Sequence, residues 1–138
     1  MKLNSNQQKK IKQIVLKNRI LFAVAFGSKA KGKQRAGSDL DIAVLTGKKP
    51  TYKLFGELFG KFSQVFKKEN IDLRFLNEAD PFFRHQVTKN GVLLFGDQHQ
   101  YNLFKIYAYR SFVDDGRKYF PYLEKSIREK QKKLEKSL

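Results

Sequence analysis

Two acidic residues that follow a glycine-serine pair are the strongest candidates for a chemical role in this sequence. Gly27 and Ser28 close the apolar run ILFAVAF, and Asp39 and Asp41 open the apolar run that follows the next loop. Because strand side chains alternate between faces, Asp39 and Asp41 are predicted to project from the same side of one strand. Carboxylates held that close repel each other unless a cation lies between them, and their hard oxygen atoms suit Mg²⁺ or Mn²⁺.

Asp72 is the third candidate in this acidic group. It lies in IDLRFL, where Ile71, Leu73 and Phe75 alternate with polar residues, so the segment is predicted to be a strand with one polar face. If this strand pairs beside the one that carries Asp39 and Asp41, Asp72 joins them. Three carboxylates can hold two metal ions, which stabilise the attacking and leaving oxygen atoms in phosphoryl displacement.

The loop that begins at Gly27 has the features of a phosphate-binding turn. A glycine at the end of a strand lets the backbone turn sharply and approach a ligand, and a following helix start offers free N–H groups to an anion. The Ser28 hydroxyl adds a further donor. The same loop carries four basic residues, Lys29, Lys31, Lys33 and Arg35. The predicted nucleotide-binding residues are Gly27, Ser28, Lys29 and Lys33, and the predicted substrate is a metal-bound nucleoside triphosphate.

The spacing of apolar residues predicts the strands and helices that carry these candidate residues. Strands are predicted over 20–26, 39–45, 71–76 and 91–95, and helices over 5–18, 52–68 and from 98 onward. Ser5 is available as the N-cap of the first helix, Asp80-Pro81 marks a turn or helix start, and Gly116 or Pro121 could break the last helix. The predicted fold class is α+β: a small mixed sheet of four strands packed by helices, with a helical C-terminal extension.

The segment GSKAKGKQRAGSDLD places ten residues between Gly-Ser and Asp-x-Asp. This pattern resembles the signature of the DNA polymerase beta nucleotidyltransferase superfamily, and the short chain is most similar to its minimal nucleotidyltransferase (MNT) group. The resemblance implies a polymerase-beta-like fold, with Gly27 and Ser28 at the triphosphate and Asp39, Asp41 and Asp72 as metal-binding catalytic residues. It further implies Mg²⁺-dependent transfer of AMP from ATP to a tyrosine of a partner HEPN toxin, which is the action of an MNT-type antitoxin.

Two other motifs overlap the same loop, and the sequence excludes both interpretations. Gly27-x4-Gly32-Lys33 approaches the nucleotide-binding P-loop, but Gln34 stands where a metal-binding Ser or Thr is required. Too few residues separate Lys33 from the next strand for a helical crossover. Ser28-x-x-Lys31 lacks the companion motifs of serine acyl-enzymes.

Two arginines are further candidates for the site. Arg74 and, more weakly, Arg84 are expected to contact phosphate or to neutralise the acids.

The length, composition and charge of the chain limit the domain number, the chemistry and the partners that can be expected. The 138 residues suit one compact domain, predicted to comprise a catalytic part over 1–97 and the helical extension over 98–138. No cysteine is present, which excludes thiolate chemistry. The polar start MKLNSNQQKK and the short apolar runs predict a cytoplasmic protein without a membrane span. The net charge of +16 favours phosphate-rich or acidic partners, and the excess lies in residues 1–50 and 101–138.

Several alternatives stay open at this stage. A small-molecule nucleotidyltransferase of the aminoglycoside type is the second enzymatic hypothesis, although the short chain leaves little room for a substrate domain unless a homo-oligomer supplies it. A non-catalytic module that binds a toxin or RNA is the hypothesis from another class. The tyrosine- and arginine-rich C-terminal helices either pack on the domain or dock a partner, and the basic ends are candidates for RNA contact.

Overall fold

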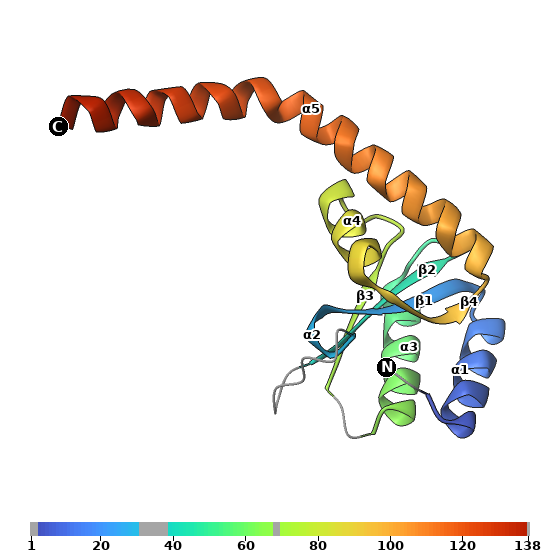
Figure 1. The fold of residues 1–138 in the computed structure, drawn as a ribbon. Helices are drawn as coiled ribbons and strands as arrows, with labels where there is room; N and C mark the ends of the chain where they lie inside the picture. Colours follow the sequence, from blue (N-terminus) through green and yellow to red (C-terminus); the bar gives the residue numbers. More distant parts are fainter. Residues whose placement is uncertain (1–2, 31–38, 68–69, 138) are drawn as a thin grey trace.

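A computed structural model describes residues 3–30, 39–67 and 70–137 of the chain. Its elements run in the order α1 (Ser5–Lys17), β1 (Ile20–Phe26), α2 (Gly27–Ala30), β2 (Leu40–Thr46), α3 (Tyr52–Val65), β3 (Ile71–Phe75), α4 (Pro81–Asn90), β4 (Val92–Gly96) and α5 (Gln98–Ser137). The strands form one sheet in the order β3-β2-β1-β4. The mixed four-stranded sheet and its helices confirm the predicted α+β fold (Figure 1).

Strand direction follows from the connections. β1 is antiparallel to both β2 and β4. β2 and β3 are parallel, with α3 as the crossover between them. A parallel pair needs such a long connection, and the apolar stripe of α3 gives that connection a face to bury against the sheet. Leu58 and Phe62 of this stripe are fully buried.

Helices cover both faces of the sheet (Figure 1). On one face α1 and α3 bury a core with alternate strand residues, among them Ala23, Ile42 and Leu73. On the other face α4 and the start of α5 pack over a smaller core that contains Phe22, Val24, Ala43, Val87 and Tyr101. The alternation of strand side chains therefore divides the apolar strand residues of the interior between two cores.

The helix ends differ from prediction in detail. Asn4, not Ser5, is the N-cap of α1: its side chain accepts from the Gln7 N–H at 2.8 Å, and the Gln7 side chain accepts from the Asn4 N–H. Asparagine with glutamine three residues later completes a capping box, which Ser5 with Gln8 does not form. β2 begins at Leu40 rather than at Asp39, and α3 ends at Val65 rather than at residue 68.

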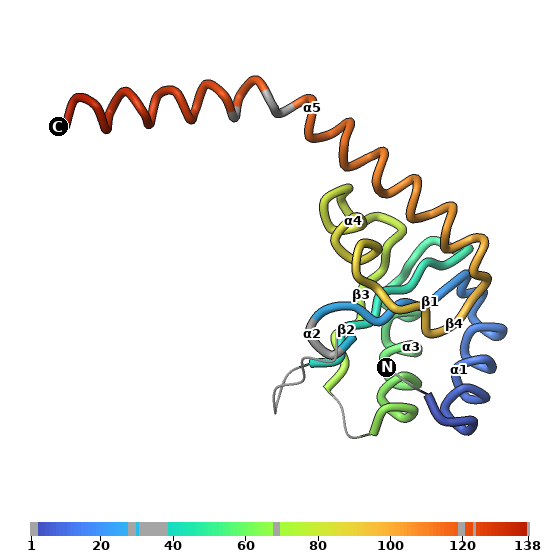
Figure 2. Tube along the Cα trace, viewed as in Figure 1, coloured from blue at the N-terminus to red at the C-terminus, as the bar shows by residue number. Residues whose placement is uncertain are grey.

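α5 is one helix of 40 residues that contains both Gly116 and Pro121, so the predicted break is wrong. Figure 2 shows the axis of α5 changing direction part-way along, and its second half leads away from the sheet. A proline inside a helix removes one hydrogen bond and bends the axis without necessarily ending the helix. In the described part of the chain, no helix is both long and apolar enough to cross a membrane.

Candidate active site

Asp41 and Asp72 lie side by side on the parallel strands β2 and β3. They are direct register partners, and the Leu40 N–H donates to the Asn70 carbonyl at 2.7 Å where the two strands begin. Register partners on paired strands have backbones about 5 Å apart and side chains on the same face. From the sequence, Asp72 is expected to join the other acids if its strand pairs beside the strand of Asp41. The structure has this pairing.

Gly27 borders the acidic pair from the other side. The antiparallel partner of Asp41 on β1 is Phe26, and the chain passes from Phe26 directly into α2 through Gly27. Gly27 has a φ of +78°, and a Cβ at this position would collide with Oδ2 of Asp41. Glycine is therefore required here both for its left-handed backbone and for the space that the Asp41 carboxylate occupies.

The electrostatics of Asp41 reflect the crowding of acids. Burial raises the pKa of the Asp41 carboxyl above its usual value, and the negative charges of Asp72 and then Asp39 raise it further. A hydrogen bond between the protonated Asp41 carboxyl and Asp72 acts in the same direction, whereas Arg74 lowers the pKa. Asp39 is exposed and immediately precedes β2. The three predicted carboxylates thus influence one another.

Arg74 supplies the positive charge of the site. Its Nε lies 3.7 Å from Oδ2 of Asp72, and the Arg74 side chain is 57% exposed while that of Asp72 is 39% exposed. The Arg74 guanidinium also lies over the Phe83 ring of α4, with Cζ 5.3 Å from the ring centroid. Phe83 packs edge-on against Phe26 at 5.8 Å. The expected neutralising role of Arg74 therefore has a structural basis in an ion pair and a cation–π contact.

Sequence reasoning did not single out Phe83. One feature of the sequence could have indicated Phe83. It lies two residues after Pro81, in the first turn of a helix that starts soon after the strand of Asp72 and Arg74. Whether that turn faces the acids depends on how α4 packs, which no local pattern specifies.

Arg84 has a different role from the one predicted. Its Nε donates to the Leu76 carbonyl at 2.9 Å, another of its nitrogens donates to the Asn77 carbonyl, and a third donates to the Tyr107 hydroxyl at 3.1 Å. These bonds tie α4 to the loop after β3 and to α5. The expectation that Arg84 contacts phosphate or neutralises the acids is replaced by this structural role.

The other basic candidates are only partly visible. Ser28 and Lys29 lie in α2, so the predicted helix start after Gly27 is observed. Their side chains lie outside what the structure describes, and so does all of Lys33 together with Lys31 and Arg35. Their assignment to the nucleotide stays a prediction.

The donor chemistry of the site fits a hard divalent cation. Within residues 3–30, 39–67 and 70–137, no three His, Cys, Asp or Glu side chains are gathered closely enough to hold a metal ion as they stand. Binding at Asp39, Asp41 and Asp72 therefore requires side-chain movement. The mutual repulsion that raises the pKa of Asp41 is the kind of stress that a bound cation relieves.

The mixed sheet presents carboxylates on two parallel strands beside the Gly27 turn, which is the arrangement that the resemblance in sequence implies. The chain belongs to the polymerase beta nucleotidyltransferase family, because the model of the family described as "Polymerase beta, Nucleotidyltransferase" matches residues 9–100. The protein is accordingly a nucleotidyltransferase. No curated protein sequence matches the chain closely enough to refine this assignment.

Solved structures with the same fold include three toxin-antitoxin complexes. One, described as a toxin-antitoxin with AMP-PNP, has 24% identity and a TM-score of 0.73, and covers 87% of this chain and 98% of that chain. A second, a tri-AMPylated Shewanella oneidensis HEPN toxin in complex with MNT antitoxin, has 22% identity and a TM-score of 0.68, with coverage of 88% and 97%. A third, the toxin-antitoxin MntA-HepT, has 21% identity and a TM-score of 0.68, with coverage of 90% and 99%. At these identities the likeness shows the fold.

Proposed function

We propose that the protein transfers AMP from ATP to a tyrosine hydroxyl of a partner HEPN toxin and thereby acts as an antitoxin. The observation that carries the proposal is the pairing of Asp41 with Asp72 beside the Gly27 turn, in a chain of the nucleotidyltransferase family. Its fold resembles antitoxins solved with AMP-PNP and with an AMPylated HEPN toxin, which favours ATP and a protein acceptor.

The reaction forms one bond and breaks one. The tyrosine oxygen attacks the α-phosphorus of ATP, the new O–P bond joins AMP to the acceptor, and the bond between the α- and β-phosphates breaks to release pyrophosphate. The hydroxyl proton passes to Asp72, which lies at the outer side of the acid row and is 39% exposed. Gly27 lets the backbone approach the triphosphate.

Asp39, Asp41 and Asp72 would hold the metal ion, with Mg²⁺ as the expected species, two ions as the expected number and Mn²⁺ as the substitute. When bound, the cation would neutralise triphosphate charge and stabilise the pyrophosphate leaving group. Arg74 forms an ion pair with the Asp72 carboxylate and restrains its position. Ser28, Lys29 and Lys33 are assigned to the phosphates. A cytoplasmic setting, where ATP is available, belongs to the same proposal.

The partner contact is assigned to α5. Its first half packs on α4, whereas Tyr122, Ile127 and Leu134 of its second half are 73%, 60% and 65% exposed. Exposed apolar side chains on a helix that leads away from the domain are suited to a protein partner. The division into a catalytic part over 1–97 and a helical extension over 98–138 belongs to this proposal.

The decisive experiment separates adenylyl transfer from other activities. Purified protein, Mg²⁺ and a HEPN toxin encoded beside it are incubated with ATP labelled in either the α- or the γ-phosphate. Label is expected on the toxin from α-labelled ATP alone, and mass spectrometry is expected to locate AMP on a tyrosine. Asp39→Asn and Asp41→Asn are expected to abolish transfer, whereas Glu57→Gln on the exposed surface of α3 keeps it.

Each contrary outcome is informative. Label that appears on a small molecule instead of protein would favour the aminoglycoside-type reaction. Neutralisation of the toxin by Asp39→Asn and Asp41→Asn as well as by the wild type would contradict the catalytic proposal and favour a binding module. Circular dichroism of each variant shows whether loss of transfer reflects loss of folding.

A further inference from the structure

The open edge of the sheet at β4 forms a groove with one face of α1. Among the described residues, β4 is an edge strand that pairs with β1 alone. A hollow of about 520 Å³ lies beside it, lined by Ser5, Gln8, Lys9 and Lys12 of α1 and by Leu93–Gly96 of β4. One face of a strand would contribute only alternate residues. Because four consecutive β4 residues line the hollow, it runs along the backbone edge of the strand.

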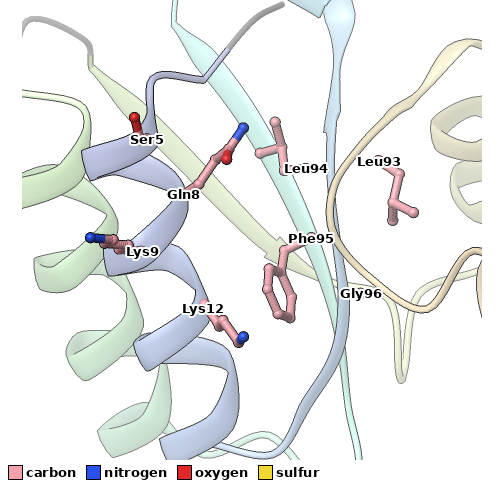
Figure 3. Close-up of a pocket in the computed structure, with 8 residues that line it drawn as sticks. All are labelled: Ser5, Gln8, Lys9, Lys12, Leu93, Leu94, Phe95 and Gly96. Atoms are coloured by element: carbon pink, nitrogen blue, oxygen red, sulfur yellow. The ribbon is translucent and has the colours of Figure 1, made fainter.

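The two sides of this groove are chemically different. The β4 side is apolar and half-buried, and as an edge it offers backbone N–H and C=O groups that no strand in the described part of the chain uses. The α1 side is polar and basic: Lys9 and Lys12 are exposed, and α1 contains no acidic residue. Figure 3 shows Gln8 and Lys12 extending from α1 toward Leu94 and Phe95, while Lys9 points away from β4.

We propose that this groove binds an extended acidic segment of another protein, which adds to the sheet as a fifth strand beside β4. Strand addition next to a flanking helix gives affinity through main-chain hydrogen bonds and specificity through alternate side chains. Acidic side chains on the helix-facing side of such a segment would meet Lys12 and the Gln8 amide, and Lys9, which also lines the groove, adds to its positive charge. The volume lies within the range of about 300–1,000 Å³ that is usual for ligand sites.

The same groove disfavours other occupants. A second copy of this chain that paired edge to edge through β4 would bring its own α1 lysines against those of the first, in a protein of net charge +16. The β1–β4 register shifts between Ala23 and Val24, so Leu94 has no direct partner. Bulges and lysines are the usual means by which edge strands avoid indiscriminate pairing. They restrict this edge to a partner with compensating charge.

The groove is separate from the candidate active site. β1 and β2 lie between β4 and Asp72, so occupation of the groove does not require nucleotidyl transfer. The groove also gives a role to part of the positive charge of residues 1–50 that the acidic site does not use.

The test uses short peptides as probes of the full chain. The probes are an acetylated and amidated hexapeptide of alternating Glu and Val, its Lys-Val counterpart, and a Glu-Val peptide with N-methyl groups on alternate amides. The Glu-Val peptide is expected to shift the amide resonances of residues 92–96 and of α1, and to slow hydrogen exchange in β4. The Lys-Val and N-methylated peptides are expected to bind at least about tenfold more weakly.

Matched variants separate local charge from total charge. Lys9→Glu/Lys12→Glu is expected to reverse the preference to the Lys-Val peptide. Lys10→Glu/Lys17→Glu changes the total charge equally, but these lysines line the hollow between α1 and α3 and should leave binding unchanged. Equal effects of the two double variants, equal binding of the N-methylated peptide, or resonance shifts confined to residues outside α1 and β4 would overturn the proposal. ATP binding and adenylyl transfer, measured on the same variants, report separately on the proposed function.

Discussion

Asp41 and Asp72 are direct register partners across the parallel strands β2 and β3, so two carboxylates that are 31 positions apart in sequence share one face of the sheet. Like charges placed opposite each other in a sheet destabilise it. In the proposed function, the fold accepts this cost at the place where a cation, a triphosphate and an acceptor hydroxyl meet, and perturbed carboxyl groups of this kind are typical of active sites.

The first prediction concerns the pH dependence of stability without divalent metal. The pKa of Asp41 is raised in the folded protein, so the folded state binds its proton more tightly than the unfolded chain does. The protonated Asp41 carboxyl therefore stabilises the folded state fully at pH values below 3.8, its ordinary pKa. This stabilisation is lost as the pH rises through the raised pKa of the folded protein. Asp41→Asn should remove this loss and raise the free energy of unfolding at neutral pH by roughly 0.5 to 1 kcal/mol.

Urea denaturation from acidic to neutral pH in the presence of a chelator checks this prediction. Asp114→Asn serves as the control, because Asp114 is exposed on α5. If Asp41→Asn followed the same pH profile as the wild type, the inferred rise in the pKa of Asp41 through burial and neighbouring acids would be wrong.

A second prediction compares two glycine substitutions. Gly27→Ala should lower the free energy of unfolding by about 1 to 2 kcal/mol, because alanine is strained at a φ of +78° and its Cβ would displace the Asp41 carboxylate. Gly56→Ala should raise it by about 0.5 to 1 kcal/mol, because Gly56 lies inside α3 with open space around it. Denaturant titration of both variants tests the difference, and equal effects would contradict the steric account of Gly27.

Arg74 provides a third prediction. Arg74→Gln removes the ion pair with Asp72 and the cation–π contact with Phe83. Adenylyl transfer should fall by about tenfold or more, as for other residues that orient a catalytic carboxylate. Stability should change little, because the Arg74 side chain is 57% exposed. Initial-rate kinetics and thermal unfolding on the same samples measure the two effects.

Two variants control this measurement. Arg74→Lys keeps the charge and should recover part of the activity. Arg84→Lys should instead lower stability, since Arg84 bonds backbone carbonyls of Leu76 and Asn77. Full activity in Arg74→Gln would exclude a positioning role for Arg74.

The fourth prediction concerns Tyr101, which is 2% exposed. Among the described residues its hydroxyl has no hydrogen-bond partner, and its burial raises its pKa. Tyr101→Phe keeps the ring contact with Phe22 at 5.3 Å and should raise the free energy of unfolding by about 1 kcal/mol. The control is Tyr107→Phe, which deletes the acceptor of an Arg84 hydrogen bond and should lower stability. Calorimetry measures the stability of both variants. Destabilisation by Tyr101→Phe would show that the Tyr101 hydroxyl has a hydrogen-bond partner in the folded protein.

Several elements could be predicted because their signals are local. The apolar run of β1, the alternation in β3 and the phenylalanine stripe of α3 each report the periodicity of the element itself. The ends were less predictable, because an N-cap is chosen by competition between neighbours, as Asn4 and Ser5 illustrate. The continuity of α5 through Gly116 and Pro121 also escaped local rules, since helix-breaking residues lower stability by amounts that other contacts can offset.

The local motif of Gly27-Ser28, ten residues and Asp39-x-Asp41 was enough to identify the family. Side-chain alternation, a property of the local backbone, was enough to place Asp41 and Asp72 on strands, whereas Asp39 precedes β2. Long-range packing sets the remaining features of the site. It pairs β3 parallel to β2 with Asp72 opposite Asp41, brings Arg74 into contact with Asp72 and Phe83, and bonds Arg84 to backbone carbonyls instead of the acids. Strand order, register and helix packing depend on how distant apolar faces are buried together, and no short stretch of sequence contains that information.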